Sequence, residues 1–278
     1  MEQPPVGESV GLVPGHRTDS PPSGLRRGSL SRGRAPRGPL DPRSAVVTAV
    51  AWSGACLFVA SLLWFLYAYL VRFGAAAPAG ARVRPISIDI VLFSVFALHH
   101  SLFARTSLKA WVRRMIPPVL ERSLYTSIAS VLFLVVCGAW QPVPGVLYRI
   151  EGPWRWLAAA AQLSGILLTF LGSKTLDVLD LAGVRAVIRA RTAAAPVHVP
   201  LSASGVYGLV RHPVYFGWAL LVCGAADMTA TRAVFALVST AYVALAIPWE
   251  ERGLIETFGA AYEDYRRKVR WRMIPGMY

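Results

Sequence analysis

The chain has 278 residues, of which 55% are hydrophobic and only 16% are charged, and its mean hydropathy is +0.47. This composition is too apolar for an ordinary soluble domain and is typical of a protein that lies in a bilayer. The formal charge of +14 would suit a nucleic-acid partner, but the basic residues are spread over short segments between apolar runs. We therefore expect a membrane protein without a nucleic-acid partner.

Residues 1–43 are rich in Pro, Gly, Ser and Arg and contain almost no large apolar side chains. This composition predicts a disordered cytoplasmic tail, which either serves as a solvated orientation signal or binds anionic lipid headgroups. We expect residues 44–278 to form one integral-membrane domain.

Apolar runs at helical length follow the tail. Four of them, at 45–71, 86–103, 123–140 and 156–173, are long enough to cross a hydrocarbon core of roughly 30 Å. Two further uncharged arms, at 213–226 and 233–249, predict a helical hairpin whose first arm is short for a full crossing. The sequence predicts an all-α polytopic bundle with about five or six membrane segments.

Two segments outside these runs alternate apolar and charged residues at helical spacing. One covers 181–191, and the other follows Glu251, where Leu254, Phe258, Tyr262 and Tyr265 recur on one face. Such patterns are typical of amphipathic helices that lie along the headgroups.

Cys56, Cys137 and Cys223 each lie inside an apolar run, with no CxxC spacing and no His at metal-ligand distance. This placement predicts three small buried side chains and no metal site.

Lys and Arg are concentrated in the tail, in 104–122, in 174–211 and after Glu250, and are sparse on the other side of the predicted spans. The positive-inside rule then places these segments in the cytoplasm. We expect a bacterial inner-membrane protein with a cytoplasmic N-terminus.

Charged and aromatic side chains bracket the hairpin. Arg211, His212 and Tyr215 stand before its first arm, and Glu250 and Glu251 follow its second. If the arms pack antiparallel, these groups meet at one membrane surface, where they would suit a zwitterionic, sugar-bearing sulfonium cofactor. The alternative is a set of interfacial ion pairs that anchors the hairpin.

The same stretch carries a longer pattern. It reads Gly205-x-Tyr207-(x)3-Arg211-His212-Pro213-x-Tyr215-x-Gly217, followed by Glu250-Glu251-(x)2-Leu254-(x)3-Phe258-Gly259-(x)2-Tyr262-(x)2-Tyr265. This pattern resembles the C-terminal signature of the integral-membrane methyltransferases, which include isoprenylcysteine carboxyl methyltransferases and phospholipid N-methyltransferases.

Upstream motifs extend the resemblance to about residues 45–275. They include His100-Ser101, Glu121-Arg122-Ser123 and Asp180-Leu181-x-Gly183-x-Arg185. These motifs are similar to the branch that contains methanethiol S-methyltransferases and NnrU-type membrane proteins. The sequence departs from that branch at Leu179 and His99, where the family has His and Gln.

The resemblance implies an S-adenosyl-L-methionine pocket at the cytosolic face, within about residues 200–275, and a lipid-side tunnel for an apolar acceptor. The residues that it implies for the cofactor are Gly205, Tyr207, Arg211, His212, Pro213, Tyr215, Gly217, Glu250 and Glu251. For Gly217, a role in letting the two hairpin arms approach closely is the alternative.

A thiol acceptor must lose its proton, because the thiolate is the nucleophile. His100, Glu121 and Asp180 are the candidate bases, and Asp89 lies near the opposite face, where it fits a helix N-terminal charge. The alternatives are that His99 and His100 are packing residues and that Glu121 and Arg122 form a local ion pair.

The leading hypothesis is an S-adenosyl-L-methionine-dependent membrane methyltransferase that converts methanethiol to dimethyl sulfide, with membrane lipids as its surroundings. A lipid amine or an isoprenylcysteine carboxylate is the alternative acceptor. A non-enzymatic NnrU-type membrane protein is the alternative from another class.

Overall fold

The computed structural model describes residues 41, 44–103, 106–175, 178–192, 201 and 203–278, so the predicted tail lies outside the described residues except for Asp41. Five described helices are long and apolar enough to cross a membrane. They are α1 (Ala45–Leu70), α2 (Val83–Phe103), α4 (Glu121–Ala139), α5 (Trp154–Thr175) and α9 (Ala230–Phe258). The predicted helical membrane bundle is thereby confirmed, and the chain is an integral-membrane protein.

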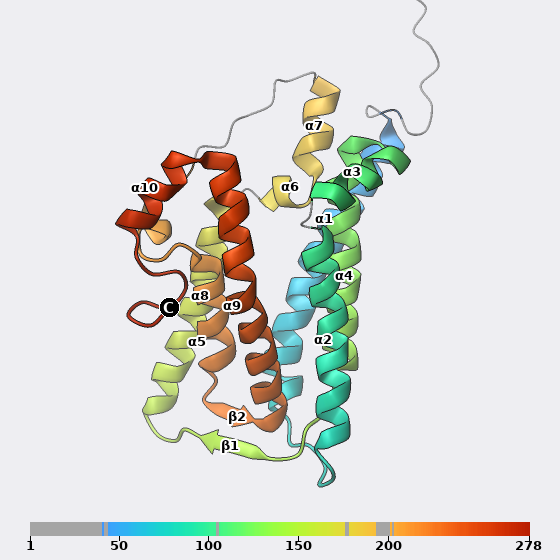
Figure 1. The fold of residues 1–278 in the computed structure, drawn as a ribbon. Coiled ribbons are helices and arrows are strands. Elements are labelled where there is room, and N and C mark those ends of the chain that lie inside the picture. The colour runs from blue at the N-terminus through green and yellow to red at the C-terminus, as the bar shows by residue number, and fades with distance from the viewer. Residues whose placement is uncertain (1–40, 42–43, 104–105, 176–177, 193–200, 202) are drawn as a thin grey trace, which may run out of the picture. The chain divides into compact units, whose positions relative to one another are not determined.

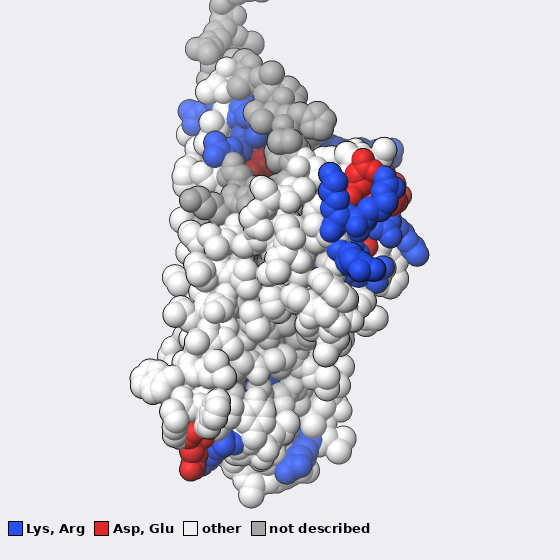
Figure 2. Space-filling view, turned by 90° about the vertical axis from the view of Figure 1, so that its left-hand side faces the viewer, with Lys and Arg blue, Asp and Glu red and all other residues white. Residues whose placement is uncertain are grey.

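The distribution of charged side chains on the surface also fits a membrane protein. In Figure 2, almost all charged side chains lie near the two ends of the molecule, and a broad uncharged belt separates them. Such a belt is the surface that a hydrocarbon core requires.

Helix α8 (Pro213–Cys223) is apolar but too short for a full crossing, in agreement with the predicted short first arm. It packs mainly against α5 and contacts α9 less extensively. A Cβ built on Gly217 would lie 2.6 Å from the carbonyl oxygen of Gly165 and 2.6 Å from Thr169 Oγ1. Gly217 therefore permits close α5–α8 packing, and the expected close approach of the two hairpin arms at this glycine was wrong.

The tip of the hairpin contains a strand that the sequence did not predict. Strand β2 (Asp227–Thr229) pairs antiparallel with β1 (Val146–Arg149), with Arg149 opposite Asp227 (Figure 1). Thr229 then caps α9, because its hydroxyl accepts a hydrogen bond from the Arg232 amide at 3.2 Å.

Helix α9 continues past the predicted end of the second arm. It passes through Pro248 without breaking, and the carbonyl of Ala244, which Pro248 cannot serve, accepts instead from the Tyr278 hydroxyl at 3.3 Å. Gly259, with φ +54°, ends the helix, and α10 (Ala260–Lys268) begins. The amphipathic segment predicted after Glu251 is therefore two elements, with Leu254 and Phe258 on α9 and the two tyrosines on α10.

Three shorter helices gather at the same end of the bundle as α10 (Figure 1). They are α3 (Thr106–Met115), α6 (Val178–Leu181) and α7 (Val184–Thr192). Helix α7 covers most of the amphipathic segment predicted at 181–191, and it buries Val184 and Val187.

The core between α1, α2, α4, α8 and α9 is rich in aromatic rings, including Phe65, Tyr69, Phe93, Phe133 and Phe235. Two expectations about buried groups were wrong. Cys56 and Cys223 are exposed on outward faces, and only Cys137 is buried. Asp89 is fully buried in the second turn of α2, where it accepts a hydrogen bond from the Gln141 amide at 2.8 Å, rather than lying at a helix N-terminus.

Candidate functional site

The C-terminal segment folds back onto the start of α8. The amides of Arg211 and His212 donate to the carbonyls of Trp271 and Arg272, at 2.9 and 2.8 Å. Pro213 occupies the first turn of α8, where its missing N–H costs no hydrogen bond. These contacts fix the side chains of Arg211 and His212 beside the last turns of α9.

Arg211 and Glu251 form a buried ion pair. Arg211 Nε donates to Glu251 Oε1 at 2.6 Å, and its Nη1 donates to the carbonyls of Val269 and Arg270 at 2.8 and 2.9 Å. The two side chains are only 6% and 4% exposed. A buried pair of this kind is stable only when its remaining groups are hydrogen-bonded. The chain itself satisfies these groups, so the pair ties α8, α9 and the C-terminal segment together.

Glu250 stands next to this pair and is much more accessible, with a side chain that is 45% exposed. Tyr215 donates its hydroxyl to Glu250 Oε2 at 2.8 Å, and the ring of Tyr215 stacks on that of His212 with an interplanar angle of 3°. His212 Nε2 is buried without a hydrogen bond, although it lies 3.5 Å from Glu251 Oε1. We call Arg211, His212, Tyr215, Glu250, Glu251 and Arg272 the polar cluster.

Tyr207 and Gly205 lie beside the polar cluster in a short 3-10 turn. Gly205 has φ +61°, a left-handed conformation that favours glycine. The Tyr207 hydroxyl donates to the carbonyl of Gly172 at 3.3 Å, and the carbonyl of Tyr207 accepts from Tyr265 at 2.7 Å. Burial, with a further contribution from the charge of Glu250, raises the pKa of Tyr207 to about 12, so this phenol stays protonated at neutral pH and donates a hydrogen bond.

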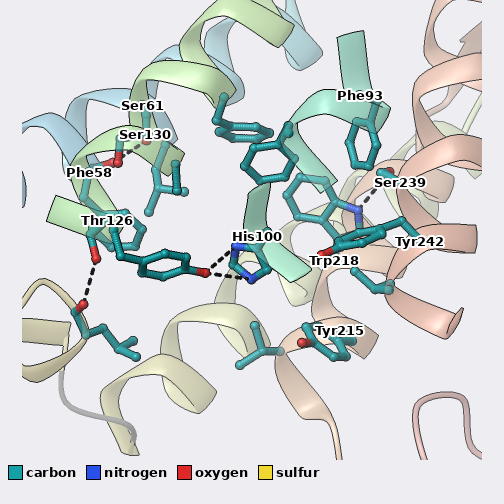
Figure 3. Close-up of a pocket in the computed structure, with 18 residues that line it drawn as sticks. Phe58, Ser61, Phe93, His100, Thr126, Ser130, Tyr215, Trp218, Ser239 and Tyr242 are labelled. Carbon is teal, nitrogen blue, oxygen red and sulfur yellow. Dashed lines mark hydrogen bonds between the residues drawn. The ribbon is translucent and has the colours of Figure 1, made fainter. Parts of the chain in front are cut away.

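A cavity of about 430 Å³ lies between α1, α2, α4, α8 and α9. Figure 3 shows aromatic rings on several sides of it. Its lining includes Phe58, Ser61, Leu62, Phe93, Phe96, His100, Tyr125, Phe133, Tyr215, Trp218 and Tyr242. Tyr215 belongs to both features, because its ring lines the cavity and its hydroxyl bonds to Glu250.

His100 lines this cavity and contacts Tyr125 from α4. The Tyr125 hydroxyl lies 2.6 Å from His100 Nδ1 and 3.3 Å from Nε2 (Figure 3). His99 does not line the cavity; its ring stacks on the ring of Tyr125 and lies tilted against that of Phe103.

The other two candidate bases are held in ion pairs. Glu121 pairs with Arg113, and Asp180 pairs with Arg122 and, at 2.7 Å, with Arg189. Burial alone would raise the pKa of Asp180, but the two arginines outweigh it and lower the pKa. Neither carboxylate lines the described cavity. Their arrangement favours a role in joining α4 to α3, α6 and α7.

Two parts of the cavity lining were not predicted from the sequence. One is the part that α1 contributes, namely Phe58, Ser61 and Leu62. The other is Trp218, although that residue lies three positions after Tyr215 and therefore on the same face of α8. The helical spacing could have identified Trp218, whereas nothing in the apolar run of α1 distinguishes one face from another.

A helical membrane protein in which a polar cluster adjoins an aromatic-lined cavity has the layout of an enzyme that brings a polar and an apolar reactant together. Comparison with known proteins agrees. The chain is 35% identical over 188 residues to methanethiol S-methyltransferase 2 of Bradyrhizobium diazoefficiens, covering 66% of this chain and 71% of that protein. It is 34% identical over 202 residues to methanethiol S-methyltransferase of Mycobacterium tuberculosis, covering 70% and 79%.

The chain belongs to the methanethiol S-methyltransferase family of membrane methyltransferases. A more distant similarity, 28% over 169 residues, links it to nurim of Xenopus laevis and covers 58% of this chain and 59% of that protein. No protein-family profile and no solved structure matches the chain.

Proposed function

We propose that the protein transfers a methyl group from S-adenosyl-L-methionine to the sulfur of a small apolar thiol, with methanethiol as acceptor and dimethyl sulfide as product. Methanethiol is the acceptor in the names of its relatives. The observation that carries the proposal is the dual placement of Tyr215, which lines the apolar cavity and bonds to Glu250 in the polar cluster. A polar donor and an apolar acceptor would meet at this side chain.

The polar cluster fits a zwitterionic methyl donor. The cluster contains two arginines and two glutamates: both arginines pair with Glu251, whereas Glu250 keeps an accessible carboxylate for an ammonium group or ribose hydroxyls. His212 Nδ1 lies 3.6 Å from Glu250 Oε2, so the imidazole adjoins this accessible carboxylate. We assign Glu250, His212 and Tyr215 to donor contact. Arg211, Glu251, Pro213, Gly205 and Tyr207 shape the cluster, and Gly217 contributes through packing.

When bound, S-adenosyl-L-methionine would supply a methyl group on a positively charged sulfur. The acceptor sulfur would bond to that methyl carbon while the bond between the carbon and the sulfonium sulfur breaks and S-adenosylhomocysteine leaves. The apolar cavity walls position the thiol, and positioning is the main requirement of such a transfer. We assign His100 as the base: a ring nitrogen of its neutral imidazole accepts the thiol proton, and the Tyr125 hydroxyl, 2.6 Å from Nδ1 and 3.3 Å from Nε2, orients the ring.

The acceptor alternatives gain no support from the cavity. Its described lining contains no carboxylate or arginine, so no charged side chain there would pair with a cationic headgroup or a prenylcysteine carboxylate. Glu121 and Asp180 remain less favoured bases, because each is already committed to arginine.

We place the polar cluster and the N-terminus in the cytoplasm of a bacterial cell, with the protein in the inner membrane. The cluster lies at the same end as α3, α7 and α10 (Figure 1), and the last turns of these helices carry Arg or Lys. This side would give the polar donor direct access.

The test is turnover by full-length, detergent-purified protein that is given S-adenosyl-L-methionine and methanethiol. We expect equal amounts of S-adenosylhomocysteine and dimethyl sulfide. Production of neither, with phosphatidylethanolamine and a prenylcysteine equally inactive, would contradict the proposed reaction.

A further inference from the structure

The cavity is much larger than methanethiol. Its volume is about 430 Å³. Methanethiol has two heavy atoms and needs roughly 60 Å³, about twice the share of one water molecule in the liquid. An apolar protein cavity of about 150 Å³ already accommodates benzene. Methanethiol would therefore leave most of the cavity wall without contact.

The wall also has the chemistry of a site for a carbon-rich group. Its hydrogen-bonding groups are largely served by the chain, because Thr126 donates to the Leu181 carbonyl at 3.0 Å and Ser61 to the Phe58 carbonyl at 2.7 Å. Trp218 Nε1 donates to Ser239 Oγ at 3.0 Å. What remains toward the cavity is mainly ring and aliphatic surface, which favours an aromatic or branched apolar ligand.

The position of His100 limits how such a ligand can lie. Tyr215 marks the side of the polar cluster, while Phe58, Ser61 and Leu62 of α1 line the cavity elsewhere. A thiol whose sulfur lies near Tyr215 and His100 would direct its carbon group toward the rings of Phe96, Phe133 and Trp218 or toward the α1 wall.

From this geometry we infer that the acceptors of this enzyme include thiols with an apolar group of ring size, and that these are better substrates than methanethiol. The inference rests on the proposed thiol methyl transfer and specifies the substrate class of the same cavity. Because burial of each additional methylene strengthens binding about fourfold, phenylmethanethiol should exceed methanethiol in kcat/KM by at least about tenfold.

The experiment compares methanethiol, 1-butanethiol and phenylmethanethiol with the full-length purified protein and follows S-adenosylhomocysteine formation. Methanethiol and 1-butanethiol have similar acidities, whereas phenylmethanethiol is more acidic, so rates are compared at equal thiolate concentration and the comparison then reports fit. Binding is measured separately, as the shift in melting temperature caused by dimethyl sulfide or by methyl phenylmethyl sulfide, the products of methanethiol and phenylmethanethiol.

Ala129→Phe fills the cavity from α4, because Ala129 lines it. Val131→Phe is the matched control, since Val131 is on the same helix, is 47% exposed and does not line the cavity. We expect Ala129→Phe to lower kcat/KM for phenylmethanethiol about tenfold more than it lowers kcat/KM for methanethiol, and an unchanged melting temperature shows that the variant folds. Val131→Phe should leave both unchanged.

If kcat/KM stayed constant or fell from methanethiol to phenylmethanethiol, the inference would be overturned and the proposed function would stand. An equal loss of kcat/KM for both thiols in Ala129→Phe would also overturn the inference. No turnover of any thiol would overturn the proposed function. If methyl phenylmethyl sulfide still stabilised the wild type and not Ala129→Phe, the cavity would remain a site for ring-sized apolar ligands.

Discussion

Two buried arginines stand near opposite ends of α9, and they are satisfied in different ways. Arg232, in the first turn, donates only to backbone carbonyls, those of Tyr69, Leu70 and Asp227, at 3.1, 2.7 and 2.7 Å. Arg211 pairs with the carboxylate of Glu251 at the other end and also donates to two carbonyls. Both residues are 8% exposed.

The difference lies in what surrounds each arginine. The Arg232 end is closed by carbonyls and by the pairing of β1 with β2, and its partners are all parts of the chain. The Arg211 end also holds Glu250, whose side chain is 45% exposed and therefore keeps a carboxylate that water can reach. This accessible carboxylate is the reason to propose a ligand there, whereas Arg232, bonded only to carbonyls, links α9 to α1 and β2.

The largest effect should come from Arg211→Ala. This change removes the hydrogen-bonded partner of the buried Glu251 carboxylate and leaves only Arg272 and His212, each at 3.5 Å, and breaking such a pair costs about 3–5 kcal/mol of unfolding free energy. Arg232→Ala should cost less, about 1–3 kcal/mol, because the three carbonyls that it leaves are neutral and those of Leu70 and Asp227 are at partly buried sites that water can reach. Melting temperatures in detergent measure both, and an equal or larger loss for Arg232→Ala would remove the distinction between the two ends.

His100→Ala should lower kcat with methanethiol by at least about 100-fold, because a positioned general base contributes that much or more. His99→Ala is the control, since His99 does not line the cavity. Donor binding should be unchanged in both variants. A kcat for His100→Ala within a few-fold of wild type would assign His100 to packing.

Tyr215→Phe removes the hydroxyl that joins the cavity to the polar cluster. Loss of one hydrogen bond to the charged Glu250 should weaken donor binding about tenfold. Tyr148→Phe is the matched control at the Arg232 end, where the hydroxyl lies 3.4 Å from the Cys223 carbonyl. Calorimetric titration would contradict the account if both changes had the same effect.

The smallest expected effect is on stability at low pH. Arg189 and Arg122 lower the pKa of Asp180 in the folded protein, so its contribution to stability is complete above the unfolded pKa of about 4 and disappears as pH falls through the folded value. The melting temperature should therefore fall below about pH 4. Asp180→Asn should reduce this fall in melting temperature at low pH. An unchanged fall would show that Asp180 contributes nothing to stability.

Much of the fold could be predicted because bilayer thickness translates directly into runs of apolar residues, as in α1 and α2. The ends of elements were harder. The second arm was expected to end at residue 249, yet α9 continues through Pro248 to Phe258, and Tyr278 serves the carbonyl that Pro248 leaves open. That contact joins residues distant in the chain, so the residues around Pro248 do not predict it.

The candidate site shows the same limit. The residues of the polar cluster other than Arg272 could be predicted, because charged side chains are rare next to apolar runs and therefore conspicuous. Which of them are satisfied within the protein could not, because the partners of Arg211 include backbone carbonyls of Val269 and Arg270. The cavity lining on α1 was equally hidden, since an apolar helix shows no preferred face in its sequence.

The most direct test is calorimetric titration of S-adenosyl-L-methionine into the purified wild type, Glu250→Gln and the control Glu256→Gln, which alters an exposed carboxylate on the same helix. We predict saturable binding to the wild type and to Glu256→Gln. Glu250→Gln should bind about 10- to 100-fold more weakly at an unchanged melting temperature, because it loses hydrogen bonds to a charged group. Equal affinity in all three proteins, or no binding to the wild type, would contradict the assignment of the polar cluster to the methyl donor.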